Sequence, residues 1–488
     1  MNILFLNPPF LGRFSRSSRS PAVTKGGTLY YPIWLSYAAG VAEQAGYAVR
    51  LLDAPAQGLG VDEVFQKLFP FSPDLIVIDT STPSIFHDVK VATEFKGRFP
   101  HSFIVLVGTH PSALPEETLQ ISAAVDGVAV GEYDFIIRDL AAALASGKDM
   151  ATVAGLVWRD NGQVVVNAGR EKIIDLDSLP FVTSVYKKHL DVRDYFFAAA
   201  SYPMVMIMSG RGCPHRCFFC VYPQVMHGRR YRVRSAENVV EEMAYVAHYL
   251  PEVREVGFED DCFTANIRRV HDICEQIIAR NIRMKWYCNV RGNLEYPTLA
   301  LMKQAGCRLV TVGFESGCQQ VLDGMHKDEK VEHYHAFGRA ARRAGMLVHG
   351  CLMVGNPGDT AETLAASYEF AKRIDCDSMQ FYPLYVYPGT EAYDWAVKNN
   401  YLSTTDFAEW LTPDGLHNCV LNTPELSAAE MVGLCDTYLK KYHLRPSYIA
   451  RKAWQGLCNP SEGLRTVKSA RVFLSKLLAG QLSKTTRK

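Results

Sequence analysis

The sequence predicts an α/β protein with two parallel sheets followed by a smaller helical region. Short apolar runs alternate with helix-like segments along most of the 488 residues, a rhythm typical of parallel sheets covered by helices. A chain of this length is expected to form two or three domains. Since the alternation pauses and then resumes, we predict the boundaries 1–140, 141–203 (a connector), 204–400 and 401–488.

Composition gives the broad class. The chain is 48% hydrophobic and 21% charged with a net charge of +1, so nothing global argues for a nucleic-acid partner. Met1–Pro9 lacks the basic start and small-residue cleavage site of a signal peptide. Thirteen cysteines without a paired framework suit a reducing compartment, so we expect a cytoplasmic protein.

Five apolar runs in residues 1–140 predict a doubly wound, Rossmann-like parallel sheet. Its first two strands should flank a helix from Trp34 to Ala45, which ends at a glycine. The strands are expected at Ile3–Leu6, Val49–Leu52, Leu75–Ile78, Ile104–Val107 and Gly127–Val130.

Small and polar residues follow the last three of these strands. Ligands of such sheets bind outside the carboxyl ends of the strands, which makes these loops candidate binding residues. For the domain taken alone, ordinary turns explain them better. No GxGxxG follows the first strand, which argues against a dinucleotide site. The candidates are Thr80, Ser81, Thr82, Gly108, Thr109, His110, Gly131 and Glu132.

The connector carries one clear local signal. Asp160-Asn161-Gly162 between the apolar runs Gly155–Arg159 and Val164–Val166 predicts a hairpin. Beyond this hairpin, the connector is expected only to join the two larger domains.

Residues 204–400 repeat the strand–helix rhythm six times, which predicts a (β/α)6 partial barrel with its site at the carboxyl ends of the strands. Helices are expected at Ala236–Tyr249, Arg268–Arg280 and Thr360–Arg373. The strands are expected at Val205–Met208, Glu255–Phe258, Lys285–Asn289, Leu309–Gly313, Val348–Val354 and Ser378–Leu384.

A CxxxCxxC motif, Cys213, Cys217 and Cys220, follows the first of these strands. Thiolates hold iron–sulfur clusters, usually four to a cluster, so three leave one iron open for a small molecule. A structural zinc site is the alternative, but it closes with four ligands and usually has a second cysteine pair, which is absent here. Disulfides fit poorly, because the other cysteines are scattered singly.

At these residues the chain resembles the radical S-adenosylmethionine (SAM) enzymes, whose signature is CxxxCxΦC with Φ aromatic. Here Φ is Phe219. The resemblance implies that the three cysteines bind a [4Fe–4S] cluster, that the open iron binds SAM, and that Phe219 lies near the adenine.

The resemblance also implies SAM contacts at the ends of later strands. The acids would hold the ammonium group, while the glycine would admit the nucleoside. Solvated turns and surface pairs explain the same residues when each is taken alone. These candidates are Glu259, Asp260, Asp261, Arg291, Glu315, Ser316 and Gly355.

Placed before such a core, residues 1–140 resemble the cobalamin-binding domain of one large radical SAM class. The resemblance rests on Asn7-Pro8-Pro9, Val107-Gly108-Thr109-His110 and Gly131-Glu132. The DxHxxG motif, whose histidine ligates cobalt in many cobalamin domains, is missing. We therefore expect no histidine ligand on cobalt, with His87 and His110 as the residues that would contradict this.

The family resemblance implies a cobalamin-dependent methylation of an unactivated carbon, driven by a 5′-deoxyadenosyl radical from SAM. A cobalamin-dependent cyclase, ring-rearranging or oxidising enzyme remains open, as does a non-catalytic corrinoid or redox sensor. The expected partners are a small-molecule substrate and an electron donor such as flavodoxin or ferredoxin. The resemblance further implies a hydrophobic substrate, because family members that act on lipids and tetrapyrroles have helical C-terminal tails similar to residues 464–488 of this chain.

Two basic segments need separate interpretation. Arg229, Arg230, Arg232 and Arg234 suggest phosphate contacts, although a half-buried strand with a solvated face is simpler. Residues 464–488 hold seven Lys or Arg and no acid among apolar residues, which predicts a basic amphipathic helix. This helix would either dock on the protein or make peripheral contact with a membrane, and the sequence favours docking. Helix is also expected at Trp410 and Ala428–Leu439.

Overall fold

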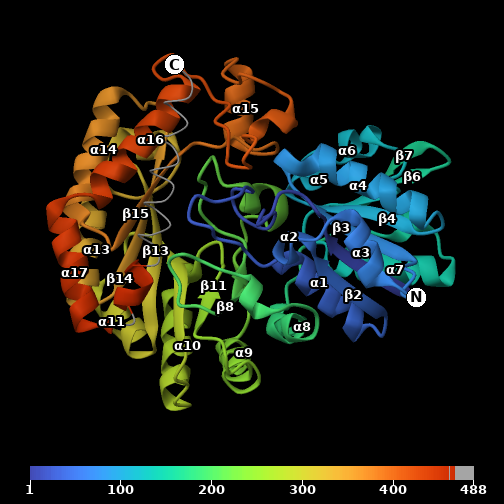
Figure 1. Ribbon diagram of the computed structural model, residues 1–488, viewed down its shortest axis with the longest axis horizontal. Helices are drawn as coiled ribbons and strands as arrows, with labels where there is room; N and C mark the ends of the chain where they lie inside the picture. The colour runs from blue at the N-terminus through green and yellow to red at the C-terminus, as the bar shows by residue number, and fades with distance from the viewer. Residues whose placement is uncertain (461, 468–488) are drawn as a thin grey trace.

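The computed structural model describes residues 1–460 and 462–467. Two sheets form the two halves of the molecule, the N-terminal sheet on the right of Figure 1 and the second sheet on the left. This arrangement confirms the predicted fold class.

The N-terminal sheet has seven strands, and all five predicted strands are present. The first five are parallel, while β6 and β7 are antiparallel, so the sheet is mixed and not wholly parallel as expected. The predicted hairpin forms β6 and β7 and extends this sheet, so part of the expected connector adds to the first sheet. In sheet order the strands are β2 (Ala48–Asp53), β1 (Asn2–Asn7), β3 (Leu75–Thr80), β4 (Phe103–Gly108), β5 (Gly127–Ala129), β6 (Leu156–Asp160) and β7 (Gln163–Val166).

Both faces of this sheet are buried because its strands are apolar on both sides. In β1, Ile3 and Phe5 face one core, while Leu4 and Leu6 face another, as the two-residue period of a strand requires. The helices α1 (Ile33–Gln44) and α7 (Asp134–Ser146) cover the first face. The second is covered by α3 (Val61–Leu68), α4 (Ile85–Arg98) and α6 (Pro115–Ile121).

Three shorter helices lie at strand ends or in the connector, namely α2 (Ala54–Gln57), α5 (Thr109–Ala113) and α8 (Val182–His189). Helix α8 packs on α1 and on the start of the second sheet. The connector therefore contributes to the core between the two sheets as well as joining them.

The second sheet has six parallel strands, and all six were predicted. Predicted helices α9 and α10 also match to within one residue at either end. In sheet order the strands are β15 (Ser378–Pro383), β14 (Leu347–Val354), β13 (Cys307–Glu315), β12 (Lys285–Val290), β11 (Glu255–Phe258) and β8 (Met204–Ile207). The helices are α9 (Ala236–Tyr249), α10 (Ile267–Ala279), α11 (Tyr296–Gln304), α12 (Gln319–Gly324), α13 (Val331–Arg343), α14 (Ala361–Ile374) and α15 (Glu391–Lys398).

The C-terminal region is helical. Helix α16 (Ala428–His443) packs on β15 and contains the predicted Ala428–Leu439 helix, and α17 (Pro446–Cys458) follows it. Trp410 ends a 3₁₀ turn, Phe407–Trp410, instead of lying in a longer helix. Residues 462–467 are helical, and the rest of the predicted 464–488 helix lies outside the described residues.

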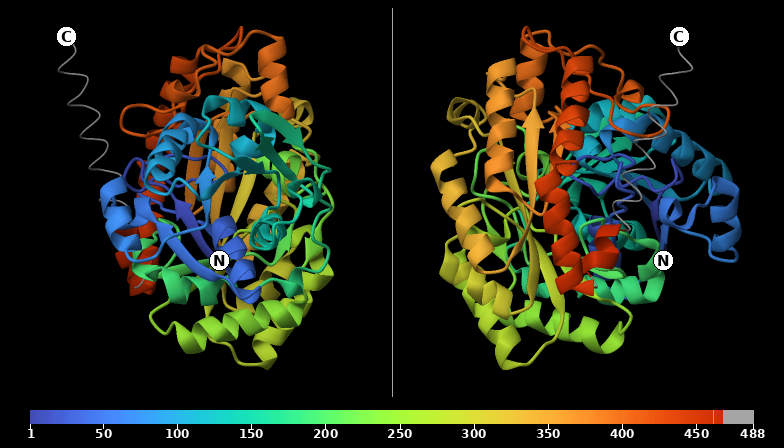
Figure 2. Two further views of the ribbon diagram at one scale, coloured as in Figure 1. Left: turned by 90° about the vertical axis from the view of Figure 1, so that its right-hand side faces the viewer. Right: turned by 60° about the vertical axis from the view of Figure 1, so that its left-hand side comes forward.

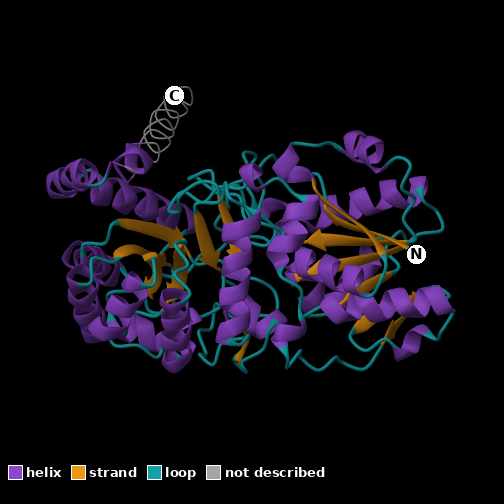
Figure 3. Ribbon diagram, turned by 90° about the horizontal axis from the view of Figure 1, so that it is seen from below, coloured by secondary structure: helices purple, strands orange, loops and turns teal. Residues whose placement is uncertain are grey.

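The carboxyl ends of both sheets face each other. Arg19, in the loop after β1, reaches Glu259, which follows β11, and Glu132 after β5 pairs with Arg232 beside the cysteine loop. The left view of Figure 2 has the N-terminal domain in front, and Figure 3 shows loops gathered between the two groups of strands. Residues placed at either carboxyl edge therefore meet at one interface.

Candidate functional site

The cysteine loop begins after a small ribbon formed by β9 (Gly210–Arg211) and β10 (Arg232–Val233). The Cys213 N–H donates to Gly228 O at 3.3 Å, and Gln224 Nε2 donates to Phe218 O and Cys220 O at 3.0 and 2.9 Å. Cys213 is buried, whereas Cys217 and Cys220 are partly exposed, and all three thiols are free. A π-helical turn, Tyr222–Met226, follows the third cysteine. The backbone therefore fixes the three thiols within one closed loop.

These thiols fit a cluster better than a single ion. Among the described residues, no three His, Cys, Asp or Glu side chains converge as one metal ion would require. The thiolates of a cubane cluster bind separate irons and need not converge on one point. Burial raises the pKa of the Cys213 thiol to about 12, so its thiolate needs a nearby positive charge such as bound iron.

Cys262 is a fourth thiol that sequence spacing did not place near the loop. It is buried, its Sγ lies 3.9 Å from Thr264 Oγ1, and its charge adds to the raised pKa of Cys213. Cys262 follows β11, which pairs with β8, so the fold brings it toward the loop that follows β8.

The three acids after β11 have different surroundings. The buried Asp260 accepts from the Ser209 N–H at 2.7 Å and from Ser209 Oγ at 2.5 Å. Asp261 accepts from the Gly212 N–H at 3.0 Å and lies 2.8 Å from His227 Nδ1. Both carboxylates are therefore used in holding the start and end of the cysteine loop.

Glu259 is the acid whose partners come from outside this loop. Its Oε2 lies 3.1 Å from Arg19 Nη1, and its Oε1 accepts from Tyr287 Oη at 3.3 Å. Arg19 also donates to the backbone oxygen of Asp260 at 2.7 Å. The N-terminal domain thus places a guanidinium at the edge of the second sheet.

The end of β13 forms a second charged group. Glu315 has a left-handed backbone, φ 62°, where the pairing register with β14 also shifts. Such strain collects at functional sites. Its carboxylate accepts from Tyr382 Oη at 3.1 Å and lies 3.4 Å from Lys327 Nζ. Lys327 is buried and lies 3.6 Å from Glu329, and nothing in its local sequence indicated this role.

The remaining SAM candidates lie around this group with varied partners. Arg291 donates to Asp328 O at 2.7 Å, and its buried Nε has no hydrogen-bond partner among the described residues. Ser316 Oγ lies 3.1 Å from Ser367 Oγ. The Phe219 ring lies edge-on to Phe218, with 6.0 Å between centroids.

Gly355 has φ 97° and starts a turn closed by Asp359. The positive φ favours glycine here, and a Cβ built on Gly355 would also lie 2.5 Å from Met431 Sδ of α16. The side chain of Met431 occupies the space that we expected a nucleoside to approach.

On the N-terminal side, the β3 loop is held by one buried carboxylate. Asp88 pairs with Arg16 at 2.5 Å, with neither side chain exposed, and accepts from Thr80 Oγ1 and Ser84 Oγ, each at 2.6 Å. Ser81 Oγ lies 2.9 Å from Ser84 Oγ. Thr80 and Ser81 therefore already have protein partners.

Thr82 and His110 meet at the same edge. His110 is buried, with Nδ1 3.3 Å from Thr82 Oγ1 and its ring 4.9 Å from the Phe407 ring. Burial lowers its pKa to about 4, so its ring is neutral at neutral pH. Thr109 precedes it as the first residue of α5. The His87 ring lies 4.9 Å from Phe10 at this edge.

The observed contacts of the other loop candidates are with protein groups that hold the loops in place. A Cβ on Gly108 would lie 2.2 Å from Thr80 O, so this close approach of β3 and β4 needs glycine. The Gly131 N–H donates to Ser112 Oγ at 2.9 Å. Glu132 pairs with both terminal nitrogens of Arg232 and lies 3.9 Å from Arg211 Nη1.

These ion pairs correct the interpretation of the arginine run. Arg232 and Arg234 are buried, not solvated, and pair with Glu132 and Glu242. The predicted strand is reduced to the two residues of β10. Acidic partners explain the difference, Glu132 from the first domain and Glu242 from the following helix α9, because they allow guanidinium groups inside the protein.

Two buried polar atoms at the interface lack hydrogen-bond partners among the described residues, Tyr133 Oη and His227 Nε2. Tyr133 follows Glu132 after β5, and His227 ends the cysteine loop. Asp79, at the end of β3, is also buried, and burial raises its pKa to about 7. A polar ligand between the sheets would satisfy such groups, so these residues fit a bound corrinoid.

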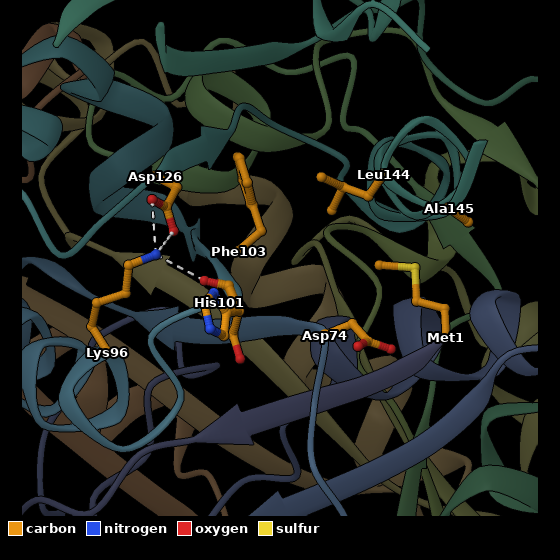
Figure 4. A pocket seen from close by; sticks show the side chains of 9 residues that line it. Met1, Asp74, Lys96, His101, Phe103, Asp126, Leu144 and Ala145 are labelled. Atoms are coloured by element: carbon orange, nitrogen blue, oxygen red, sulfur yellow. Dashed lines mark hydrogen bonds and ion pairs between the residues drawn. The ribbon is translucent and has the colours of Figure 1, made fainter. Parts of the chain in front are cut away.

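Two hollows lie away from the cysteine loop. The first, about 570 Å³, is at the amino-terminal edge of the first sheet, where Lys96 pairs with Asp126 at 2.8 Å (Figure 4). It faces away from the interface. The second, about 700 Å³, lies between Phe10, Pro83 and Phe86 on one side and the segment 403–418 on the other. No described helix is long and apolar enough to cross a membrane.

Fold and site together define an α/β protein with two sheets whose carboxyl-end loops face each other. Comparisons with known proteins agree. Residues 207–371 match the radical SAM superfamily model, and residues 19–141 match the B12 binding domain model. The chain is therefore a radical SAM protein with a B12-binding domain, and these domains imply a [4Fe–4S] cluster, SAM and cobalamin as its cofactors.

Relatives extend the similarity over most of the chain. An uncharacterized methyltransferase of Pyrococcus horikoshii is 28% identical over 93% of this chain and 95% of its own length. The anaerobic magnesium-protoporphyrin IX monomethyl ester cyclase of Rubrivivax gelatinosus is 26% identical over 76% of this chain and 66% of its own. Most of the similar proteins are methyltransferases and some are cyclases.

Among solved structures, the fold is similar to that of the radical SAM methyltransferase TsrM from Kitasatospora setae with cobalamin and a [4Fe–4S] cluster bound. The TM-score is 0.66 at 18% identity, over 91% of this chain and 89% of that one. The protein is a cobalamin-dependent radical SAM enzyme.

Proposed function

We propose that this enzyme methylates an unactivated carbon of a small substrate. The observation that carries the proposal is the contact between the two carboxyl-terminal edges. Arg19 reaches Glu259, and Tyr222 Oη donates to Ser17 O at 2.8 Å. A substrate held at this interface would lie beside both cofactor loops. Most of the similar proteins are methyltransferases, which supports a methyl transfer.

The cluster and SAM would be held by the second domain. When bound, the cluster supplies the electron that splits SAM, and cobalamin supplies the methyl group. Cys213, Cys217 and Cys220 would ligate the cluster. Glu259 is the acid best suited to a SAM ammonium group, because Asp260 and Asp261 already accept hydrogen bonds that hold the loop. These two would act by positioning the cysteines.

The remaining SAM candidates keep distinct proposed roles. Phe219 would lie against the adenine, and Arg291, whose Nε lies 3.6 Å from the Glu329 carboxylate, would pair with the SAM carboxylate in place of that contact. Glu315 and Ser316 would contact the ribose or methionine from the strained end of β13. Gly355 would contribute through its backbone, since Met431 fills the space beside its Cα.

Cobalamin would lie on the loops of the N-terminal sheet. Thr82, Thr109 and His110 would contact it directly from the β3 and β4 loops. Thr80, Ser81, Gly108, Gly131 and Glu132 would support those loops through the contacts described above. His110 Nδ1 lies beside the Thr82 hydroxyl, and we retain the proposal that no histidine ligates cobalt.

The substrate is proposed to be a small, partly apolar molecule. The hollow of about 700 Å³ supports this, because Phe10 and Phe86 line it together with Pro83, the residue after Thr82. A reduced flavodoxin or ferredoxin would supply the electron. A cyclase is the second candidate, favoured by the similarity to the Rubrivivax cyclase.

Transfer of a deuterated methyl group from SAM to the product distinguishes a methyltransferase from a cyclase. Anaerobically reconstituted protein with cobalamin, reductant and SAM labelled with a trideuteromethyl group is incubated with candidate extracts. We expect 5′-deoxyadenosine and a product that carries the labelled methyl group. The Cys217→Ala variant should form neither, whereas Cys458→Ala, which changes an exposed cysteine outside the motif, should form both.

The other outcomes identify the alternatives. Formation of 5′-deoxyadenosine with an altered but unlabelled product would favour a cyclase or another rearranging enzyme. No SAM cleavage by protein with an intact, reduced cluster would contradict the enzymatic proposal and favour a sensor.

A further inference from the structure

Helix α17 is packed with its charged side toward the protein. Arg451 lies 3.2 Å from Asp375, and Lys452 lies 3.1 Å from Asp377. Tyr448 Oη and Gln455 Nε2 also donate to Asp377, at 2.8 and 3.0 Å. A helix on the surface of a soluble protein normally faces the core with its apolar side, so this orientation is reversed.

The outward side of α17 is uncharged. Trp454 is 67% exposed, Leu457 78% and Ile449 51%. At 3.6 residues per turn these positions share one side of the helix with the small residues between them. The exposed residues of α17 are Pro446, Ser447, Ile449, Ala450, Ala453, Trp454, Leu457 and Cys458.

Residues 462–467 lie beside α17 and extend this surface. A Cβ on Gly463 would lie 3.0 Å from Gly456 Cα, so the two segments touch. Glu462 anchors the second segment to Arg308 at 3.1 Å. Its apolar side chains Leu464 and Val467 are 75% and 67% exposed. We call these two residues and the eight exposed residues of α17 the apolar face.

The apolar face is remote from the cofactor interface. Figure 1 places α17 at the margin of the molecule opposite the N-terminal domain. An adjoining stretch of sequence is strongly basic, because residues 464–488 contain seven Lys or Arg and no acid. Exposed Trp and Leu beside a cluster of positive charges is the pattern of proteins that bind the interface of anionic membranes.

We propose that the apolar face rests on an anionic lipid surface, with the basic C-terminal segment adding electrostatic attraction. This goes beyond the proposed chemistry and does not depend on it. A second copy of the chain is the competing occupant. The positive charge of residues 464–488 favours an anionic surface over a second, equally basic copy.

Vesicle binding tests the proposal with the full-length protein. We expect cosedimentation with phosphatidylglycerol-containing vesicles at low salt, weak binding to phosphatidylcholine alone, and loss of binding as salt screens the charges. Trp454 is the one exposed tryptophan of six, so binding should shift the emission to shorter wavelength. The variant Trp454→Phe should bind but lose this shift.

Two sets of variants separate the apolar and charge contributions. Trp454→Ser with Leu457→Ser should weaken binding at least about tenfold. The matched control Val166→Ser with Ile174→Ser removes apolar groups that are 59% and 63% exposed on the N-terminal half and should bind normally. Lys468→Gln with Arg471→Gln should reduce the preference for anionic lipid.

Each opposing result is decisive. Failure of the full-length protein to bind anionic vesicles at low salt would overturn the proposal. Equal binding of the Trp454→Ser, Leu457→Ser variant would do the same. A concentration-dependent dimer that shields Trp454 from iodide quenching, without lipid binding, would assign the face to a second copy. These readouts do not involve SAM cleavage, so they fail or succeed independently of the proposed function.

Discussion

Replacing Glu132 with Ala tests whether this residue clamps the two domains. Arg232 and Glu132 side chains are only 3% and 2% exposed, and Arg211 lies 3.9 Å away at 1%. The substitution leaves the Arg232 guanidinium buried without its counter-charge, which typically costs about 3–5 kcal/mol. Arg232 keeps hydrogen bonds to the backbone oxygens of Ile173 and His227, at 2.7 and 2.8 Å, so we expect Glu132→Ala to lower the free energy of unfolding by about 3 kcal/mol.

This loss of stability is the difference between the free energies of unfolding of wild type and Glu132→Ala, each measured by urea denaturation of the anaerobic apoprotein. The control Glu369→Ala breaks an exposed pair with Lys372, 52% and 36% exposed, and should cost under about 1 kcal/mol. Glu132→Gln should lie between the two, because it keeps the shape and one acceptor but removes the charge.

The stabilisation by Glu132 should depend on pH. Burial acts to raise the pKa of its carboxyl, but the hydrogen bond from Arg232 and the charge of Arg211 hold that pKa below the usual 4.5. A lowered pKa means that the stabilisation is complete above the unfolded value and is lost as pH falls through the folded value. The difference between wild type and Glu132→Gln should therefore be constant at neutral pH and shrink in acid.

One result would refute the reasoning about Glu132. If Glu132→Ala unfolds with the wild-type free energy at neutral pH but takes up less cobalamin, the residue is a ligand contact and not a clamp. Loss of stability with normal cobalamin uptake under native conditions would support the clamp.

Two further predictions concern the N-terminal domain. Burial raises the pKa of Asp79 to about 7, so the folded state loses stability as pH rises from about 4 to 7. The variant Asp79→Asn should therefore unfold at a higher urea concentration than wild type near pH 8, but not near pH 4. Equal urea midpoints for the two proteins at both pH values would contradict this prediction. The EPR spectrum of the cob(II)alamin form should show no superhyperfine splitting that changes with nitrogen-15 histidine, whereas a label-sensitive splitting lost in His110→Ala or His87→Ala would place a histidine on cobalt.

The strands could be predicted from sequence because each is a continuous apolar run between turn residues. All eleven parallel strands of the two sheets were located, since burial on both faces leaves a signal within each strand. The hairpin Leu156–Val166 was also recognised, from Asn161-Gly162. Its attachment to β5 was not, because turn chemistry determines the hairpin but says nothing about which edge it joins.

The candidate site was predictable only where its residues are close in sequence. The CxxxCxxC spacing was enough to identify the three cysteines as candidate ligands. Lys327, buried between Glu315 and Glu329, carries no local signal, because its partners come from the end of β13 and its own loop. Arg232 was expected in solvent for the same reason, since its partner Glu132 is a hundred residues away. Pairing of charges is a property of the fold and not of either segment.

The three adjacent acids after β11 show how the fold distinguishes residues that the sequence presents as equivalent. Asp260 and Asp261 accept hydrogen bonds from the backbone N–H groups of Ser209 and Gly212, one on either side of β9. Among the contacts of the described residues, Glu259 is the one of the three whose side chain pairs with the other domain, through Arg19, which reaches only the backbone oxygen of Asp260. Any cation that binds Glu259 must share its carboxylate with that guanidinium or displace it. Because Arg19 belongs to the first loop of the N-terminal domain, binding at the second sheet is mechanically linked to the domain that carries the cobalamin loops.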